Sequence, residues 1–178
     1  MVENGKGLTA IVAVSQNWGI GREGQLLFHL REDLRRFKEL TMGHPVIMGR
    51  KTLQSLPGGR GLPGRRNLVL TRQPDFKAER AEAFSDVEKL LAAAGEDAFV
   101  IGGAEVYRLL LPRCQRVCVT HVLAEAEADA FFPELSRDTG WQVERTWPVC
   151  TEGNLSYRYV DYCRIKRDWG RRAAQSGE

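Results

Sequence analysis

The stretch AFVIGGAEVYRLL, residues 98–110, contains the pattern that decides the fold. Its first four residues form a short apolar run, which predicts a buried strand, and residues 104–110 are predicted to be a helix after two glycines. The same order of strand, glycine and helix recurs at residues 45–52 (PVIMGRKT). Repeated units of this kind indicate an α/β protein with helices on both faces of a sheet.

The segments on either side extend this pattern. Further strands are predicted at residues 8–14, 67–70 and 117–122, and further helices at residues 30–40 and 86–93. Residues 15–24 form a predicted glycine-rich loop. Near the C-terminus, residues 142–148 and 155–165 alternate around residues 152–154, which is typical of a hairpin. We therefore expect a mostly parallel sheet with an antiparallel end, and ligands at the carboxyl ends of its strands.

Length and composition limit the classes of function. The chain has 178 residues, of which 43% are hydrophobic and 28% charged, so we expect one globular domain over residues 1–166 and a frayed polar tail at 167–178. No apolar run approaches the roughly 20 residues that cross a bilayer, and the N-terminus does not resemble a signal peptide. We expect a cytoplasmic protein without a membrane partner. The net charge of +3 is too small to predict nucleic-acid binding. A monomer is expected, because no heptad pattern or exposed apolar helix calls for a partner.

The cysteines do not predict a metal site. Cys114, Cys118, Cys150 and Cys163 lie without a CxxC pair or a histidine at ligand spacing. Free cysteine is usually buried, so these residues are predicted to be reduced core thiols.

A carboxylate interrupts the apolar stripe of the helix predicted at residues 30–40. At about 100° per residue, Asp33 lies between the directions of Phe37 and Leu40, away from the charged face that includes Arg36. An inward carboxylate needs a donor, which a ligand in a cleft could supply. A helix-start acid in the favourable dipole field, or paired with an arginine, explains the position equally well.

Two strand-to-helix junctions, residues 49–52 (GRKT) and 102–105 (GGAE), present free backbone N–H groups that attract phosphate. Neither is a P-loop or a GxGxxG fingerprint, so each alone could be an ordinary tight turn. Thr71 and Arg72, at a third strand end, suit an extra phosphate monoester or a solvated surface. The concentration of basic residues at 50–72 favours a small ligand with phosphate or carboxylate groups.

Two single residues could also bind a ligand. Arg65 follows Pro63 and Gly64, which fix a turn, and its guanidinium could clamp a carboxylate with two prongs or simply be solvated. Thr120 lies inside an apolar strand, where it is either a plain β-former or a hydroxyl that holds a buried partner.

Taken together and in order, these segments resemble the dihydrofolate reductase family from about Leu8 to Arg164. The motifs that carry the resemblance are IVAVSQN (11–17) with GIG (19–21), DL (33–34) with FK (37–38), VIMGRKT (46–52), LPGR (62–65), LTR (70–72), IGGAEVY (101–107), TH (120–121) and FFP (131–133). One of them could occur by chance, but hardly all of them in this order.

The resemblance implies a fold and an activity. The fold is a single-domain, predominantly parallel eight-stranded sheet with an antiparallel C-terminal edge strand and helices on both faces. The activity is hydride transfer from NADPH to C6 of the pterin of 7,8-dihydrofolate, with protonation at N5, which supplies tetrahydrofolate to one-carbon metabolism and to thymidylate, purine and glycine synthesis. Dihydrofolate and antifolate inhibitors are the implied small-molecule partners.

The resemblance also implies the roles of individual residues. Asp33 matches the family's acid, which accepts hydrogen bonds from the pterin ring, and Thr120 joins that network; these two are the implied catalytic residues. Arg65 would hold the α-carboxylate of the glutamate tail. The other implied substrate-binding residues are Ile11, Val12, Ala13, Leu26, Phe28, Leu34, Phe37, Leu56, Leu62, Ile101 and Tyr107.

For NADPH, the family pattern implies a site along the strand ends. Arg50, Thr71 and Arg72 would contact the 2′-phosphate, and the loop at residues 17–26 resembles a mobile flap over the nicotinamide. The Gly102–Gly103 peptide bond is expected to be cis. The remaining implied cofactor-binding residues are Ala13, Ile20, Gly21, Gly49, Lys51, Thr52, Leu70, Ile101, Gly102, Gly103, Ala104, Glu105, Val106 and Tyr107.

The chain departs from the family pattern at three places. Leu26-Leu27-Phe28 replaces the usual Leu-Pro-Trp, whose tryptophan binds an ordered water near the pterin; phenylalanine has no donor for it. Ala128-Asp129-Ala130 replaces Gly-Asp-Thr in the loop that steadies the flap. Leu53 stands where an aromatic residue is common, which is a packing change.

Two alternatives remain. One is another NADPH-dependent reductase with this fold, such as the pyrimidine reductase of riboflavin synthesis; Asp33 and Arg65 argue against it. The other is a noncatalytic binding module, for example for RNA, which the lack of aromatic residues among the basic ones disfavours.

Overall fold

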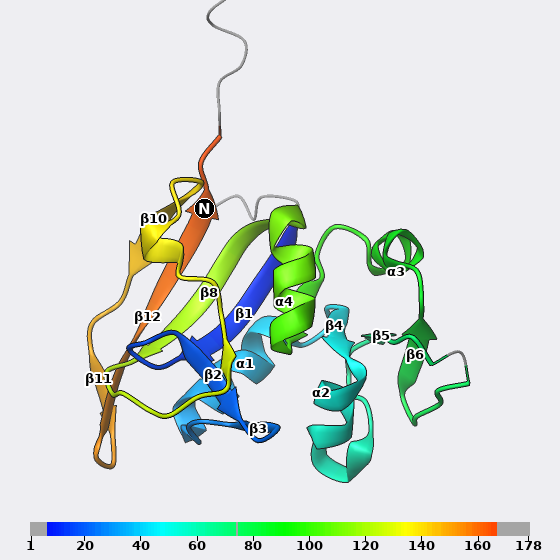
Figure 1. The fold of residues 1–178 in the computed structure, drawn as a ribbon, viewed down its shortest axis with the longest axis horizontal. Coiled ribbons are helices and arrows are strands. Elements are labelled where there is room, and N and C mark those ends of the chain that lie inside the picture. The colour runs from blue at the N-terminus through cyan, green and yellow to red at the C-terminus, as the bar shows by residue number, and fades with distance from the viewer. Residues whose placement is uncertain (1–6, 74, 167–178) are drawn as a thin grey trace, which may run out of the picture.

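A computed structural model describes residues 7–73 and 75–166. The strands of its main sheet are β1 (Leu8–Val14), β4 (Val46–Gly49), β5 (Asn67–Leu70), β6 (Ala81–Phe84), β7 (Phe99–Gly102), β8 (Cys114–Val122), β10 (Trp141–Thr146), β11 (Cys150–Glu152) and β12 (Leu155–Arg164). Their order is β10-β12-β8-β1-β7-β4-β5-β6, and β11 pairs with β12 beside this path (Figure 1). The path thus has eight strands in the described part of the chain, and β11 is a ninth.

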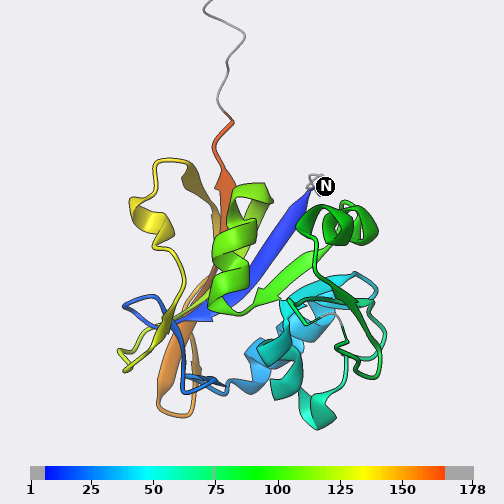
Figure 2. The same cartoon turned by 45° about the vertical axis from the view of Figure 1, so that its right-hand side comes forward.

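The sheet is parallel from β6 to β8 and antiparallel at its C-terminal end. The pairs β5–β6, β4–β5, β4–β7, β1–β7 and β1–β8 are all parallel, whereas β12 runs antiparallel to β8, β10 and β11. Accordingly β1 begins and β12 ends at the same end of the molecule (Figure 2). The predicted mostly parallel sheet is confirmed, with the refinement that β10, rather than β12, lies at the edge.

Helices cover both faces of the sheet, as predicted. They are α1 (Arg31–Thr41), α2 (Arg50–Ser55), α3 (Val87–Ala94) and α4 (Ala104–Leu110), with short 3-10 helices at Pro57–Gly59, Leu111–Arg113 and Leu135–Arg137. On β4, Ile47 packs with Leu90 of α3 and Leu110 of α4. The next residue, Met48, faces the other way and packs with Leu53 of α2. Helix α4 lies in front of the strands in Figure 1 and α1 lies behind them.

A second, small sheet has the order β3-β2-β9, with β2 at Gly19–Arg22, β3 at Gln25–Leu26 and β9 at Ala130–Phe131. The expectation that residues 15–24 are only a loop is therefore wrong. Glycine at position 21 is required by a close approach, because a Cβ there would lie 2.9 Å from the Gln25 carbonyl oxygen. The pattern missed β2 because its pairing partner, β9, is more than a hundred residues away in the chain.

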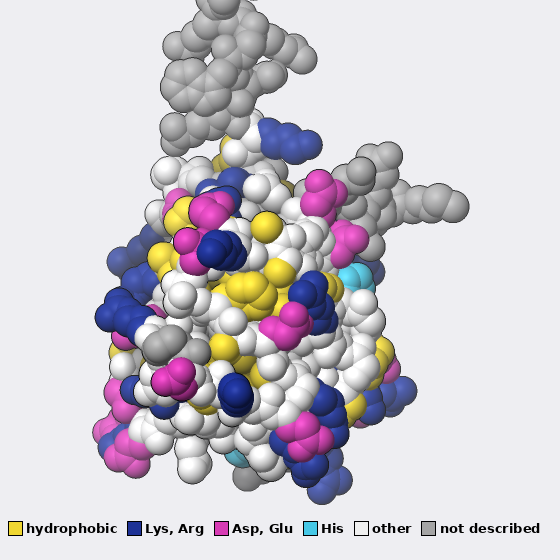
Figure 3. Space-filling view, turned by 90° about the vertical axis from the view of Figure 1, so that its right-hand side faces the viewer, with side chains coloured by type: hydrophobic (Ala, Val, Ile, Leu, Met, Phe, Trp, Pro, Cys, Tyr) yellow, Lys and Arg dark blue, Asp and Glu magenta, His cyan; other side chains and the backbone are white. Residues whose placement is uncertain are grey.

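Strand β6 was also missed, and it forms the free edge of the sheet beyond β5. Its Glu82 accepts two hydrogen bonds from the Arg66 guanidinium, at 2.6 and 2.7 Å. Charged side chains on an edge strand disfavour pairing with another chain. Seen from this end, the surface carries basic and acidic side chains around an apolar middle (Figure 3).

The structure also bears on the predictions for the cysteines, for membrane-spanning segments and for the C-terminal tail. All four cysteines are free, and Cys114 and Cys118 are buried as predicted. Cys150 is exposed in the short strand β11 and Cys163 on β12 is only half-buried, so the prediction of core thiols is wrong for these two. No helix in the described residues is both long and apolar enough to cross a membrane. The tail expected to be frayed, residues 167–178, lies outside the described residues.

Candidate active site

Asp33 lies in the first turn of α1 and points toward the sheet. The Thr120 hydroxyl, on β8, donates a hydrogen bond to Asp33 Oδ1 at 2.6 Å. The Thr120 side chain is buried, while its neighbour Val119 packs into the core on the opposite face of the sheet. The inward direction of Asp33 predicted from helical spacing is confirmed. Of the two explanations for Thr120, the structure supports a hydroxyl that holds a buried partner, which is the Asp33 carboxylate.

Burial dominates the electrostatics of this carboxyl group. Removal from water raises the pKa of Asp33 above its ordinary value, because the charged form loses hydration. The hydrogen bond from Thr120 and the positive charge of Arg36 lower the pKa, and the carboxylate of Glu152 raises it. A raised carboxyl pKa at a ligand-facing position is typical of a functional acid.

Apolar side chains lie on the same face of the sheet as the acid. Ile11 and Ala13 of β1 project from the sheet face opposite the one whose core contains Val12 and Val14. On α1, Leu34 is 51% exposed next to Asp33. The remaining predicted apolar residues near this face are Phe37 on α1, and Leu56, Leu62 and Ile101, which pack against the small cluster under α2. An exposed leucine beside a half-buried acid leaves apolar surface for a ligand.

Arg65 is held at the C-terminal end of α1. Its Nε donates to the Pro63 carbonyl oxygen at 3.0 Å, and Nη1 donates to Thr41 Oγ1 at 3.1 Å. Thr41 is itself buried and donates to the Phe37 carbonyl oxygen at 2.8 Å. Partial burial lowers the pKa of Arg65, although a guanidinium stays charged at neutral pH. These bonds orient the guanidinium without using a carboxylate, so it can still receive one.

The two predicted strand-to-helix junctions lie side by side, because β4 and β7 are neighbours and Met48 pairs with Gly102. A Cβ on Gly103, at the start of α4, would lie 3.6 Å from Thr52 Oγ1 on α2. Neither α2 nor α4 has a side-chain cap at its N-terminus, so backbone N–H groups of both are free to bind a ligand. The Gly102–Gly103 peptide bond is cis, as expected.

A third strand end adjoins these two. Leu70, the last residue of β5, pairs with Gly49, the last residue of β4. Thr71 follows and is buried, with its hydroxyl oxygen accepting from Gln73 N at 3.1 Å, and Arg72 is exposed. The structure therefore brings the predicted phosphate-binding segments of β4, β5 and β7 together along one edge. Arg50, Lys51, Ala104 and Glu105 lie in the first turns of α2 and α4 at this edge.

Some of the predicted site residues are buried in the core. Val12, Ile20, Val106 and Tyr107 belong to the core on the α3–α4 side of the sheet. The Tyr107 hydroxyl donates to the Ile11 carbonyl oxygen at 2.6 Å. Burial raises the pKa of Tyr107, which stays a neutral donor. These side chains support the floor of the site.

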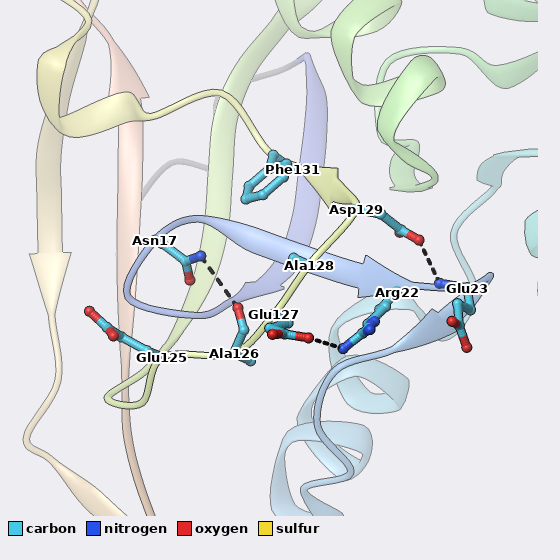
Figure 4. A pocket seen from close by; sticks show the side chains of 9 residues that line it. All are labelled: Asn17, Arg22, Glu23, Glu125, Ala126, Glu127, Ala128, Asp129 and Phe131. Carbon is cyan, nitrogen blue, oxygen red and sulfur yellow. Dashed lines mark hydrogen bonds and ion pairs between the residues drawn. The ribbon is translucent and has the colours of Figure 1, made fainter.

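The predicted flap forms β2 and β3 and contacts the loop before β9 (Figure 4). Arg22 forms an ion pair with Glu127, and Asp129 accepts a hydrogen bond from the Glu23 backbone N–H at 2.8 Å. The Asp129 backbone N–H in turn donates to the Gly21 carbonyl oxygen at 3.0 Å. Asp129 thus joins this loop to β2 and to the turn after it, although alanine flanks it on both sides. Leu26 on β3 is exposed, and Phe28 packs with Leu30 under α1.

The positions of two charged residues near Asp33 were not predicted from the sequence. Arg36, expected on the charged outer face of α1, is only 18% exposed and lies over the Tyr159 ring, so that expectation is wrong. Glu152 accepts hydrogen bonds from the backbone N–H groups of Arg31 and Glu32 and caps α1. Only the position of Arg36, one turn after Asp33, signalled a link between the two.

Comparisons with known proteins agree with this geometry. The dihydrofolate reductase family model matches residues 7–164. A dihydrofolate reductase of Mycobacterium leprae is 47% identical over 160 residues, covering 86% of this chain and 96% of that protein. One from Neisseria gonorrhoeae is 41% identical over 157 residues, covering 87% and 96%. A solved dihydrofolate reductase from Enterococcus faecalis, in complex with NADP(H) and RAB-propyl, superposes with a TM-score of 0.81 at 36% identity, covering 89% and 96% of the two chains.

Proposed function

Because the chain belongs to the dihydrofolate reductase family, we propose that it reduces 7,8-dihydrofolate to 5,6,7,8-tetrahydrofolate with NADPH. The observation that carries the proposal is the half-buried carboxylate of Asp33, bonded to Thr120 and bordered by apolar side chains beside three adjoining strand ends. The carboxylate and the apolar side chains suit the binding of a pterin ring, and the strand ends suit the binding of a dinucleotide.

Asp33 would bind and polarise the substrate. Its carboxylate can accept hydrogen bonds from a pterin ring N–H and amino group while Thr120 Oγ1 keeps Oδ1 in place. A negative charge in a site with little water stabilises the positive charge that develops when N5 is protonated, and so favours that protonation. NADPH supplies the hydride. The apolar residues Ile11, Leu34 and Phe37 would exclude water from the ring.

Arg65 would bind the other end of the substrate. Its guanidinium is already oriented by Pro63 and Thr41, so little side-chain freedom is lost when a carboxylate binds. A guanidinium and a carboxylate form a pair of parallel hydrogen bonds, which fits the α-carboxylate of the glutamate tail.

The residues at the strand ends fit NADPH. The uncapped N-termini of α2 and α4 offer backbone N–H groups to a pyrophosphate, and the lack of a Cβ on Gly103 lets a ligand approach the backbone. Arg50 and Arg72 offer guanidinium groups for a 2′-phosphate, which would favour NADPH over NADH. The remaining implied residues would line the nicotinamide and the ribose.

We also propose that residues 1–166 act as one domain, that the protein is a cytoplasmic monomer, and that antifolates occupy the pterin site. The free cysteines suit a reducing compartment. The alternatives are a different reductase with this fold and a noncatalytic module.

One experiment separates the proposed activity from these two alternatives. Purified protein is mixed with NADPH and dihydrofolate, with and without trimethoprim, and the loss of reduced nicotinamide is followed by absorbance. Oxidation that depends on dihydrofolate and is blocked by trimethoprim is the expected result. NADPH binding without turnover would instead favour a reductase for another substrate, and neither binding nor turnover would favour a noncatalytic module.

A further inference from the structure

A polar cluster that is separate from the substrate contacts lies between α1 and the antiparallel strands. It consists of Arg36 on α1, Cys118 on β8, and Tyr159 and Asp161 on β12. In the register of the sheet, Tyr159 pairs with Thr120 and Asp161 pairs with Cys118. Alternate residues share one face of a sheet, so Cys118 and Thr120 on β8 and Tyr159 and Asp161 on β12 all face α1.

Arg36 is fixed within this cluster. Its guanidinium carbon lies 3.9 Å from the centre of the Tyr159 ring, and its Nη2 lies 3.6 Å from Asp161 Oδ1. The side chains of Arg36 and Asp161 are 18% and 17% exposed. Among the described residues, Asp161 Oδ1 is buried without a hydrogen-bond partner, so Arg36 is its nearest compensating charge. A guanidinium this well packed cannot swing freely into solvent.

We infer that Arg36 is a positioning residue that favours the ionised form of the active-site carboxyl of Asp33, and that the ion pair with Asp161 reduces the effect of the Arg36 charge on Asp33. Arg36 lies one helical turn after Asp33 on the same side of α1, so the two side chains are neighbours. The Arg36 guanidinium thus pairs with Asp161 and lies over Tyr159, which pairs with Thr120, the hydrogen-bond donor to Asp33. The role assigned to Asp33 in turnover rests on the proposed function, but the electrostatic coupling does not.

The charges that face Asp33 make the direction of the effect clear. Arg36 lowers the pKa of Asp33, and Glu152 raises it from β11. Tyr159 is neutral, because burial and the Asp33 charge raise its pKa, and Thr120 does not titrate. Burial raises the pKa of Asp161, and Arg36 lowers it. Arg116 and Glu144, on neighbouring strands, form an ion pair with each other near Asp161.

Two substitutions should therefore move the pKa of Asp33 in opposite directions. Arg36→Met keeps an apolar stem over Tyr159 but removes the cation, so the pKa of Asp33 should rise by roughly one unit, the lower end of the effect of a nearby opposite charge. Asp161→Asn removes the competing anion and leaves the cation, so the pKa should fall. Arg36→Lys, which keeps the charge, should restore most of the wild-type value.

The measurement is a carboxyl titration by carbon-13 NMR on the full chain labelled at aspartate, with the Asp33 signal assigned from Asp33→Asn. The pH dependence of turnover is recorded for the same variants and should shift with the pKa. A purely structural role for Arg36 would make both variants less stable without opposite shifts, and equal pKa values in all variants would overturn the inference. If the pKa values shift as expected but no variant, nor the wild type, reduces dihydrofolate, the proposed function fails while the coupling stands.

Discussion

The hydrogen bond between Thr120 and Asp33 can be tested by removing the Thr120 hydroxyl group. Thr120→Val keeps a β-branched side chain in a strand but replaces the hydroxyl by a methyl group. The hydroxyl lies 2.6 Å from Asp33 Oδ1, and the threonine is 3% exposed, so no bulk water can take its place without rearrangement.

The size of the effect follows from the charge on the acceptor. A hydrogen bond to an ionised group contributes about 1.5–3 kcal/mol. At about 1.4 kcal/mol per pKa unit, its loss should raise the pKa of Asp33 by roughly one to two units. Since this bond is the largest of the contributions that lower the pKa, burial would then be opposed mainly by Arg36.

The sign of the stability change depends on pH. The pKa of folded Asp33 is already above the ordinary value of 3.8, so the folded protein binds the proton more tightly than the unfolded chain. Stability therefore falls as pH rises through the window between 3.8 and the folded pKa. Thr120→Val extends this window upward. The variant should lose about 1.5–3 kcal/mol at neutral pH, and the loss should shrink below the unfolded pKa, where the carboxyl is protonated in both states.

Urea unfolding of wild type and variant at neutral and acid pH checks this expectation. Tyr107→Phe is the matched control, because the Tyr107 hydroxyl is also buried but donates to the neutral carbonyl oxygen of Ile11, at 2.6 Å. Its loss should be about 0.5–1.5 kcal/mol at both pH values. A loss for Thr120→Val that does not change with pH would refute the assignment of a charged acceptor.

Four further substitutions test the site. Asp33→Asn should unfold at a higher urea concentration than wild type at neutral pH, since a buried charge is removed. The variant should lose most turnover at neutral pH and have relatively better rates in acid, where protons come from solvent. Unchanged turnover across that pH range would contradict a role for the acid. Arg65→Met should raise KM for dihydrofolate about tenfold or more, whereas a dihydropterin without the glutamate tail, the control substrate, should be unaffected. Gly103→Ala, where a Cβ would lie 3.6 Å from Thr52 Oγ1, should weaken NADPH binding in a fluorescence titration without lowering Tm. Alanine at Gly102, with φ of +126°, should instead cost about 1–3 kcal/mol of stability.

The elements that the sequence predicted well are those decided by local pattern. Strands β1 and β5 and helix α4 have the predicted bounds, because each consists of an apolar run or stripe between clear breaks. The inward direction of Asp33 also follows from local periodicity. Strand β6 was missed because its residues are mostly half-buried or exposed and do not form an apolar run.

The surroundings of Asp33 could not be read in the same way. Arg36 looks like a surface arginine from its spacing on α1, and only the pairing of β12 with β8 places Tyr159 and Asp161 beneath it. That pairing joins segments about forty residues apart. Sequence periodicity identifies which residues share a face of one element, but it does not say which face of another element they meet.

The register of the C-terminal hairpin therefore determines the environment of the active-site acid. A slip of one residue between β12 and β8 would turn Tyr159 toward the core and place the apolar Val160 under α1. The turn before β12 opposes such a slip, because Glu152 binds the backbone N–H groups at the start of α1, with 2.9 Å to Arg31 N. The same carboxylate caps the helix and raises the pKa of Asp33, so the contact that fixes the register also adds a negative charge that Arg36 must balance.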